Sequence, residues 1–222
     1  MKRQKLHGFL VIGIVWACVG WLLPMRTYAV SHGEFAAWMG VRVDWQMNRY
    51  WKFRGTFQAR TQQGLKEMER ERVNVGVNYR VLPLMQLKGY YELQYRDRGK
   101  AGWKIGHRYQ AGFVVSGPVG DFKLGWRELF QHTFIGGGKE AQLRSRLQAE
   151  YAPQECILHP YFSVESFQPV GGGAFFSLPR VRYRPGVRLG LSRKTALDVY
   201  YCRQYDVKRC LNVMGINLEI KL

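Results

Sequence analysis

The chain has 222 residues, 46% of them hydrophobic, so it is long and apolar enough to bury a core, and disorder of the whole chain is excluded. Thirty-four Lys and Arg against sixteen Asp and Glu give a formal charge of +18 at pH 7, a surplus that is typical of proteins that bind polyanions. The nature of that partner depends on where the basic side chains point.

The first 29 residues are predicted to be a cleaved signal peptide. Three cations lie among the first five residues, residues 9–24 are almost wholly apolar, and Ala29 is a small residue that suits signal peptidase. The apolar run is shorter than the roughly 20 residues that a spanning helix requires. We therefore expect export, cleavage after Ala29, and one folded domain over residues 30–222.

From residue 34 onward, apolar and polar side chains alternate in segments of about 10 to 14 residues, which is the pattern of two-faced strands. Gly, Pro, Asn or charged residues separate the segments. Eleven are predicted, at residues 34–47, 51–61, 70–82, 85–97, 103–116, 121–133, 141–152, 158–168, 179–192, 196–206 and 210–222. In segment 179–192, for example, Val181, Tyr183, Val187 and Leu189 alternate with Arg180, Arg182, Arg184 and Arg188.

A soluble β-sandwich also alternates, but its strands average only about 5 to 6 residues, whereas a tilted membrane-spanning strand needs about 9 to 11. Aromatic residues also gather at segment ends, as in the interfacial girdles of membrane barrels. Segment length, export and aromatic placement together predict an all-β, antiparallel up-and-down transmembrane β-barrel of about 10 to 12 strands in the outer membrane. A soluble basic periplasmic β-protein is the alternative.

Connection lengths indicate sidedness but leave the strand number open. Short connections near residues 48–50, 83, 117–120, 153–157 and 193–195 alternate with mostly longer ones at 62–69, 98–102, 134–140, 169–178 and 207–209. Short turns face the periplasm in such barrels, so the last strand is expected to end there. An odd count of eleven breaks the usual even number. Either the first segment is accessory to a ten-stranded barrel, or a twelfth strand is hidden.

The polar side of each strand is rich in cations, and a membrane barrel must turn that side inward, because an Arg or Lys facing lipid at the midplane costs about 2 to 4 kcal/mol. The basic residues expected to line the lumen are Arg42, Arg54, Arg60, Arg72, Arg80, Lys88, Arg108, Arg127, Arg144, Arg146, Arg180, Arg182, Arg184 and Arg188. Their expected counter-ions are Asp44, Glu92, Glu150, Glu165 and Asp198.

Two interpretations of this lumen remain open. The charged side chains either fill a small barrel structurally, or they form a narrow pore or binding cavity that favours phosphate or carboxylate solutes. Expected partners are outer-membrane lipid, the barrel-assembly machinery and small anionic solutes or lipopolysaccharide phosphates. Nucleic acid is not expected, because its binding needs the cations on one exposed surface.

Catalysis and cofactors have little support in the sequence. No Gly-x-Ser-x-Gly elbow and no Cys-x-x-Cys or Cys/His metal spacing is present, so neither a metal site nor a cofactor is expected. An outer-membrane enzyme that acts on lipid or surface substrates, built around His107 or His132 near segment ends, is the alternative. Cys202 and Cys210 flank a predicted hairpin connection and could form a disulfide; otherwise they are unpaired thiols.

Scattered positions along the mature chain resemble an uncharacterised family of small outer-membrane β-barrels from Bacteroidetes, the domain of unknown function 2490. The similar positions are Phe35 and Trp38, the turn at residues 48–51, Tyr79, residues 143–146, 160–167, 182–186 and 197–201. The resemblance implies location and architecture but no activity. The chain departs from the pattern at Leu222, where such barrels usually end in an aromatic residue.

Overall fold

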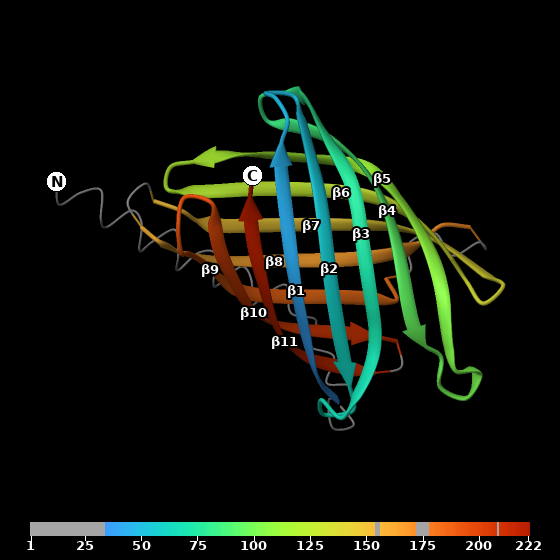
Figure 1. Cartoon of the computed structure of the whole chain (residues 1–222). Helices are drawn as coiled ribbons and strands as arrows, with labels where there is room; N and C mark the ends of the chain where they lie inside the picture. Colours follow the sequence, from blue (N-terminus) through green and yellow to red (C-terminus); the bar gives the residue numbers. More distant parts are fainter. Residues whose placement is uncertain (1–33, 154–155, 172–177, 208) are drawn as a thin grey trace. The chain divides into compact units, whose positions relative to one another are not determined.

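The computed structural model describes residues 34–153, 156–171, 178–207 and 209–222 and folds them into β-strands joined in chain order (Figure 1). The predicted signal peptide, residues 1–29, lies outside the described residues. Within the described part of the chain, no helix is long and apolar enough to cross a membrane. A 3-10 turn, η1 at Gly99–Ala101, lies between two of the strands.

The strands are long, with 11 to 17 residues each. Their bounds are β1 Glu34–Gln46, β2 Trp51–Gln62, β3 Glu67–Leu82, β4 Met85–Asp97, β5 Trp103–Val119, β6 Phe122–Ile135, β7 Gly138–Tyr151, β8 Leu158–Pro169, β9 Arg180–Gly190, β10 Thr195–Asp206 and β11 Cys210–Lys221. All eleven predicted segments correspond to strands.

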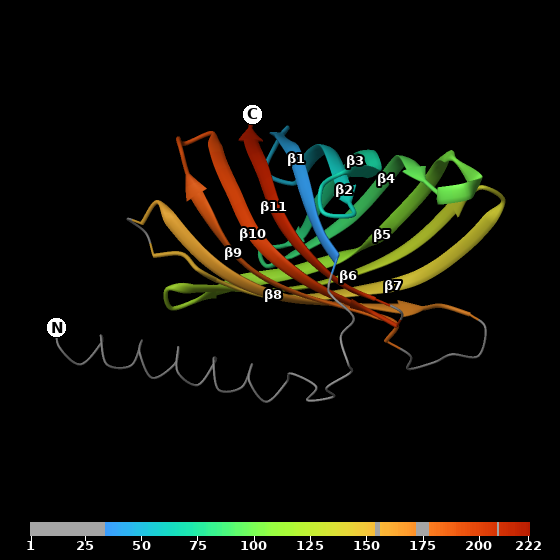
Figure 2. The same ribbon diagram turned by 90° about the horizontal axis from the view of Figure 1, so that it is seen from below.

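The sheet closes into a barrel through a parallel pair. Strands β1 to β11 pair with their chain neighbours in antiparallel fashion, and β1 then pairs with β11 in parallel, from Glu34 opposite Leu211 to Asp44 opposite Lys221. The two strands lie side by side in both ribbon views (Figures 1 and 2). An odd number of strands makes the first and the last point the same way, so closure requires one parallel pair.

This closure corrects three expectations. The first segment is not accessory to a ten-stranded barrel, because β1 pairs with β2 on one side and with β11 on the other. No twelfth strand is needed among the described residues, because the wall is already closed. The arrangement is also not antiparallel throughout, since the β1–β11 seam is parallel.

The barrel has two rims. At the C-terminal rim lie the connections at 47–50, 83–84, 120–121, 152–157 and 191–194, together with the end of β11. At the N-terminal rim lie the start of β1 and the connections at 63–66, 98–102, 136–137, 170–179 and 207–209.

The expected long connections at 62–69 and 134–140 are wrong. Strands β6 and β7 continue to a two-residue turn, in which Gly136 and Gly137 have φ of 55° and 80°. Two positive φ values in succession are what a tight hairpin turn with the twist of its strands demands. Connection length therefore separates the rims less clearly than the sequence suggested.

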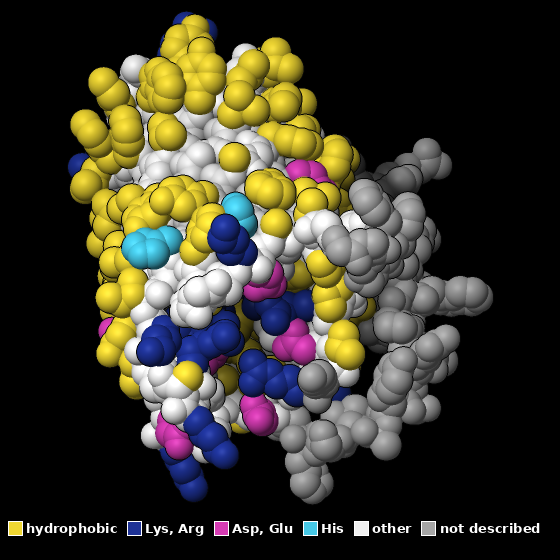
Figure 3. Space-filling view, turned by 90° about the vertical axis from the view of Figure 1, so that its right-hand side faces the viewer, with side chains coloured by type: hydrophobic (Ala, Val, Ile, Leu, Met, Phe, Trp, Pro, Cys, Tyr) yellow, Lys and Arg dark blue, Asp and Glu magenta, His cyan; other side chains and the backbone are white. Residues whose placement is uncertain are grey.

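Side chains alternate between the two faces of the wall, except where a shift in strand pairing interrupts the pattern. The most deeply buried large side chains, including Trp38, Glu92, Gln94 and Gln131, belong to the inner face. On the outer face, apolar side chains such as Val75, Ile105 and Leu147 are exposed by 50%, 60% and 62%. Figure 3 shows hydrophobic side chains over much of the outer wall and charged side chains gathered around a hollowed region.

On the inner wall, tyrosine rings pack over glycines of the neighbouring strand. Each pair places an inward tyrosine over a glycine on the neighbouring strand: Tyr90 with Gly76, Tyr161 with Gly186, and Tyr200 with Gly215. A Cβ atom on Gly215 would lie 2.0 Å from Cζ of Tyr200. The rings occupy the space that a side chain would take, so these positions require glycine.

Of the two alternatives for Cys202 and Cys210, a disulfide or unpaired thiols, the structure has unpaired thiols. Both thiols are free, and the register places Cys202 opposite Val213 and Cys210 opposite Tyr205. Successive strand residues point to opposite faces. Cys202 therefore shares the inner face with Gln204, whereas Cys210 lies next to the inward Leu211 and points outward.

Candidate functional site: a cation-rich cavity inside the barrel

A cavity of about 350 Å3 occupies the half of the barrel interior nearer the C-terminal rim. Almost every strand contributes to its lining, because alternate residues of each strand point inward. Twelve cations line it: Arg42, Arg54, Arg60, Arg72, Lys88, Lys123, Arg127, Arg144, Arg146, Arg182, Arg184 and Arg188. The acids of the lining are Glu92, Glu150 and Asp198.

Several cations on the walls are neutralised by acids on adjacent or next-but-one strands. Arg42 contacts Glu219 with an N–O distance of 2.8 Å, and Arg54 donates from Nε and Nη2 to Asp44 at 2.6 and 2.7 Å. Arg188 contacts Glu150 at 2.6 Å. Two nitrogens directed at one carboxylate hold the Arg54 side chain in a fixed orientation.

The carboxylate of Glu165 forms ion pairs with four arginines. Arg127 lies 2.6 Å from Oε1, Arg144 at 2.7 Å and Arg146 at 2.9 Å, and Arg182 lies 3.4 Å from Oε2. Glu165 is only 2% exposed, and these arginines come from β6, β7 and β9. One negative charge cannot offset four positive ones, so this wall of the cavity keeps a net positive charge.

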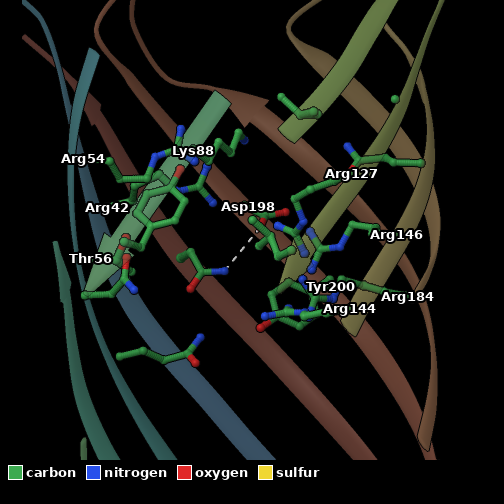
Figure 4. Close-up of a pocket in the computed structure, with 18 of the residues that line it drawn as sticks. Arg42, Arg54, Thr56, Lys88, Arg127, Arg144, Arg146, Arg184, Asp198 and Tyr200 are labelled. Carbon is green, nitrogen blue, oxygen red and sulfur yellow. Dashed lines mark hydrogen bonds between the residues drawn. The ribbon is translucent and has the colours of Figure 1, made fainter. Parts of the chain in front are cut away.

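Other cations of the lining have no acidic partner. Among the described residues, no carboxylate oxygen lies within 4.0 Å of the cationic nitrogens of Arg60, Lys88, Lys123 or Arg184. The Arg184 guanidinium lies over the Tyr200 ring at 4.3 Å instead. Figure 4 shows Arg42, Arg54 and Lys88 on one side of the cavity and Arg127, Arg146 and Arg184 on the other.

The middle of the barrel is occupied by stacked arginines and aromatic rings. Arg60 lies over the Trp38 ring at 3.9 Å, and Arg182 lies over the same ring at 5.1 Å and over Phe167 at 4.6 Å. Trp38, Arg60 and Arg182 line both the large cavity and a smaller one of about 70 Å3 towards the N-terminal rim. They form a partition between the two.

Glutamates on the inner wall bridge pairs of arginines in the same part of the barrel. Glu92, 1% exposed, contacts Arg72 and Arg108 at 2.9 Å each. Glu69 contacts Arg70 at 3.2 Å and Arg96 at 3.5 Å. Sequence reasoning missed Glu69, because the pairing of β2 with β3 shifts between Arg60 and Thr61 and so breaks the simple alternation there. It also left out Arg70, although Arg70 lies two residues before Arg72 and keeps the alternation.

The fourteen basic residues predicted for the lumen divide as follows. Eleven line the large cavity, while Arg108 and Arg180 line the smaller one. Arg80 lines neither: it is exposed at the C-terminal rim, where the pairing of β3 with β4 shifts. The expectation for Arg80 is therefore wrong, since a residue so close to a strand end leaves the enclosed space.

The predicted counter-ions behave alike except for Asp198. Asp44, Glu92, Glu150 and Glu165 each contact at least one arginine. Asp198 instead accepts hydrogen bonds from Oη of Tyr161 at 2.8 Å and from Nδ2 of Asn217 at 3.2 Å. Asp198 is thus held by neutral donors, which the sequence alone did not indicate.

The histidines considered for an enzyme lie on the outer face. His107 shares a 2.7 Å hydrogen bond with the Tyr91 hydroxyl, and His132 packs against Phe134 with ring centroids 4.2 Å apart. The described residues contain no group of three or more His, Cys, Asp or Glu side chains that could hold a metal ion.

Fold and site together define a closed eleven-stranded β-barrel with a basic internal cavity. Residues 35–210 match the family described as a protein of unknown function, DUF2490, and the chain belongs to this family. The predicted resemblance is thereby confirmed for the family itself. A comparison with curated proteins finds no match.

Proposed function

We propose that the barrel is integral to an outer membrane and that its large cavity binds a small anionic solute carrying phosphate or carboxylate groups. Exposed apolar side chains on the outer face support the first part, because they suit contact with lipid. Aromatic pairs mark both ends of this face: Trp51 with Tyr79 and Trp45 with Phe53 near the C-terminal rim, and Tyr95 with Trp103 and Tyr183 with Tyr205 near the other.

The anion site rests on one observation: Lys88 and Arg184, both half-buried, line the cavity and have no carboxylate partner among the described residues. A cation removed from bulk water is costly unless an anion compensates it. An oxyanion that enters the cavity would supply that compensation and accept several charge-assisted hydrogen bonds at once.

Binding rather than free conduction is favoured, because the stack of Arg60, Trp38 and Arg182 separates the two cavities. We place the C-terminal rim in the periplasm, since short turns face that side and the longest connection, 170–179, lies at the other rim. The interior is then filled structurally in one half and open to a solute in the other.

The first experiment decides the environment. We expect the mature protein to fractionate with outer membranes, to require detergent for extraction and to shift in gel mobility on heating. A protein that stays monomeric in water without detergent would overturn the membrane assignment. It would favour the soluble periplasmic alternative.

The second experiment measures inorganic phosphate binding to the detergent-purified barrel by isothermal titration calorimetry. Arg184→Gln and Lys88→Gln are each expected to weaken binding about tenfold, as for the loss of a charged hydrogen-bond donor. Lys100→Gln, at an exposed cation in η1 outside both cavities, should bind like the wild type. Absence of phosphate binding by the wild type would overturn the anion site.

Planar bilayers test the partition. A barrel closed at Trp38 should give no steady conductance. Anion-selective conductance steps would instead show that the barrel is an anion pore, and they would overturn the proposal of a closed binding cavity.

A further inference from the structure

The basic character of the cavity continues onto the C-terminal rim. Exposed or half-buried cations surround that rim: Arg49, Lys52, Arg80, Lys123, Arg193, Lys194 and Lys221. None of them has a carboxylate oxygen within 4.0 Å among the described residues. Only one exposed acid, Asp121, lies in the described connections there.

The N-terminal rim is different, because acids accompany its cations. Arg209 contacts Glu34 at 3.5 Å and Asp206 at 3.7 Å, and Arg96 contacts Glu69 at 3.5 Å. Glu67, Glu71, Asp97 and Glu140 add further negative charge on the same side. Lys66, Lys100 and Lys139 at this rim also lack a carboxylate within 4.0 Å, but exposed acids lie around them. The C-terminal rim, next to the large cavity, therefore has the larger excess of positive over negative charge among the described residues.

Rim and cavity are connected by rows of inward cations. On β9, Arg184 and Arg188 line the cavity, and the chain then turns at Arg193 and Lys194. Strand residues rise about 3.3 Å each, so Arg184 and Arg188 are about 13 Å apart along β9, and the row continues towards the mouth at Arg193 and Lys194. Lys123 belongs to both sets, because it lines the cavity and is exposed.

A second row rises on β2, from Arg54 in the cavity to Lys52 near the mouth. The main chain ties two rim cations together as well, since the Lys221 amide donates to the Lys194 carbonyl at 2.7 Å. These cations exceed what one small anion could contact. A single phosphate in the cavity would leave the whole rim uncompensated.

We propose that the ligand is an extended polyanion of linked phosphate groups, with one end in the cavity and the remainder crossing the C-terminal rim between Lys194, Lys221 and Lys52. This inference rests on the proposed function for its inner end. It adds the length and charge of the ligand and the side from which the ligand enters.

The test compares orthophosphate, pyrophosphate and tripolyphosphate on the folded barrel in detergent, with calorimetry at two salt concentrations. In the wild type, tripolyphosphate should bind at least about tenfold more tightly than orthophosphate, with a steeper loss of affinity in salt, because more charges are neutralised. Equal affinities for all three probes would overturn the extended ligand and leave the single-anion site standing. If no probe bound, both proposals would fail.

The rim variant combines Arg193→Gln, Lys194→Gln and Lys221→Gln, all at exposed positions. It should retain orthophosphate binding and lose the gain for tripolyphosphate. The matched control combines Lys66→Gln, Lys100→Gln and Lys139→Gln, which removes the same charge from exposed positions near the other rim. Loss of the gain in both variants would show a general charge effect and contradict a path through the C-terminal rim.

Discussion

Replacement of Glu165 by glutamine should destabilise the barrel more than any other single neutralisation of an acid on the inner wall. Glutamine keeps the size of the side chain but removes the charge that four arginines share at 2.6 to 3.4 Å. These arginines are 8% to 20% exposed at their side chains, so water screens them little. Breaking a buried ion pair costs about 3 to 5 kcal/mol, and we expect Glu165→Gln to fall in that range.

Urea unfolding of the detergent-solubilised barrel, followed by tryptophan fluorescence, measures this loss. Glu67→Gln serves as a control, because Glu67 is exposed, and it should change the free energy of unfolding by less than about 0.5 kcal/mol. Combining Glu165→Gln with Arg146→Gln removes one of the excess cations and should restore part of the loss. A Glu165→Gln variant as stable as the wild type would show that the arginine cluster does not depend on this charge.

Three further predictions concern the wall of the barrel. Gly215→Ala places a Cβ 2.0 Å from the Tyr200 ring, so it should lower the free energy of unfolding by about 1 to 3 kcal/mol or prevent assembly. Gly89→Ala is the control and should be tolerated, because a Cβ there meets nothing within 4 Å. Heat-modifiability on a gel compares the two variants. Glu128, on the outer face, accepts hydrogen bonds from Trp126 and Ser145 at 2.7 Å. Because a charge that faces lipid is costly, Glu128→Gln should stabilise the barrel in lipid vesicles by roughly 1 kcal/mol. Destabilisation in vesicles would argue against lipid contact at this position. Reducing agent should leave gel mobility and unfolding unchanged, and a maleimide should label exposed Cys156 but not Cys202 in the folded state; a mobility shift on reduction would contradict the free thiols.

The strands were predictable from the sequence because each carries its own two-faced pattern. A strand such as β9 alternates Arg180, Arg182 and Arg184 with Val181 and Tyr183, and this local pattern fixes both its extent and its faces. The inward direction of the arginines also follows from it. Where alternation is broken by a shift in pairing, as at Glu69, the prediction missed the inward residue.

Partnerships across strands were not predictable, because they depend on register and on the curvature of the closed wall. Arg127 and Glu165 are 38 residues apart in the chain and meet only through the ring of strands between β6 and β8. The pairing of Asp198 with Tyr161 is of the same kind. The parallel seam between β1 and β11 likewise carries no local signal, since each strand alternates as usual and only the ring as a whole requires it.

The position of the cavity agrees with the sizes of the inward side chains. Towards the C-terminal rim the lining includes Thr56, Ser116 and Gly125, which leave space between the arginines. Towards the N-terminal rim it includes Trp38, Phe167 and Gln142, and the space falls to about 70 Å3. Because the strands are shared by both halves, one wall supports a filled, rigid half and an open, basic half. A solute could pass from one half to the other only if the stack of Trp38, Arg60 and Arg182 separated, at the loss of its cation–π contacts.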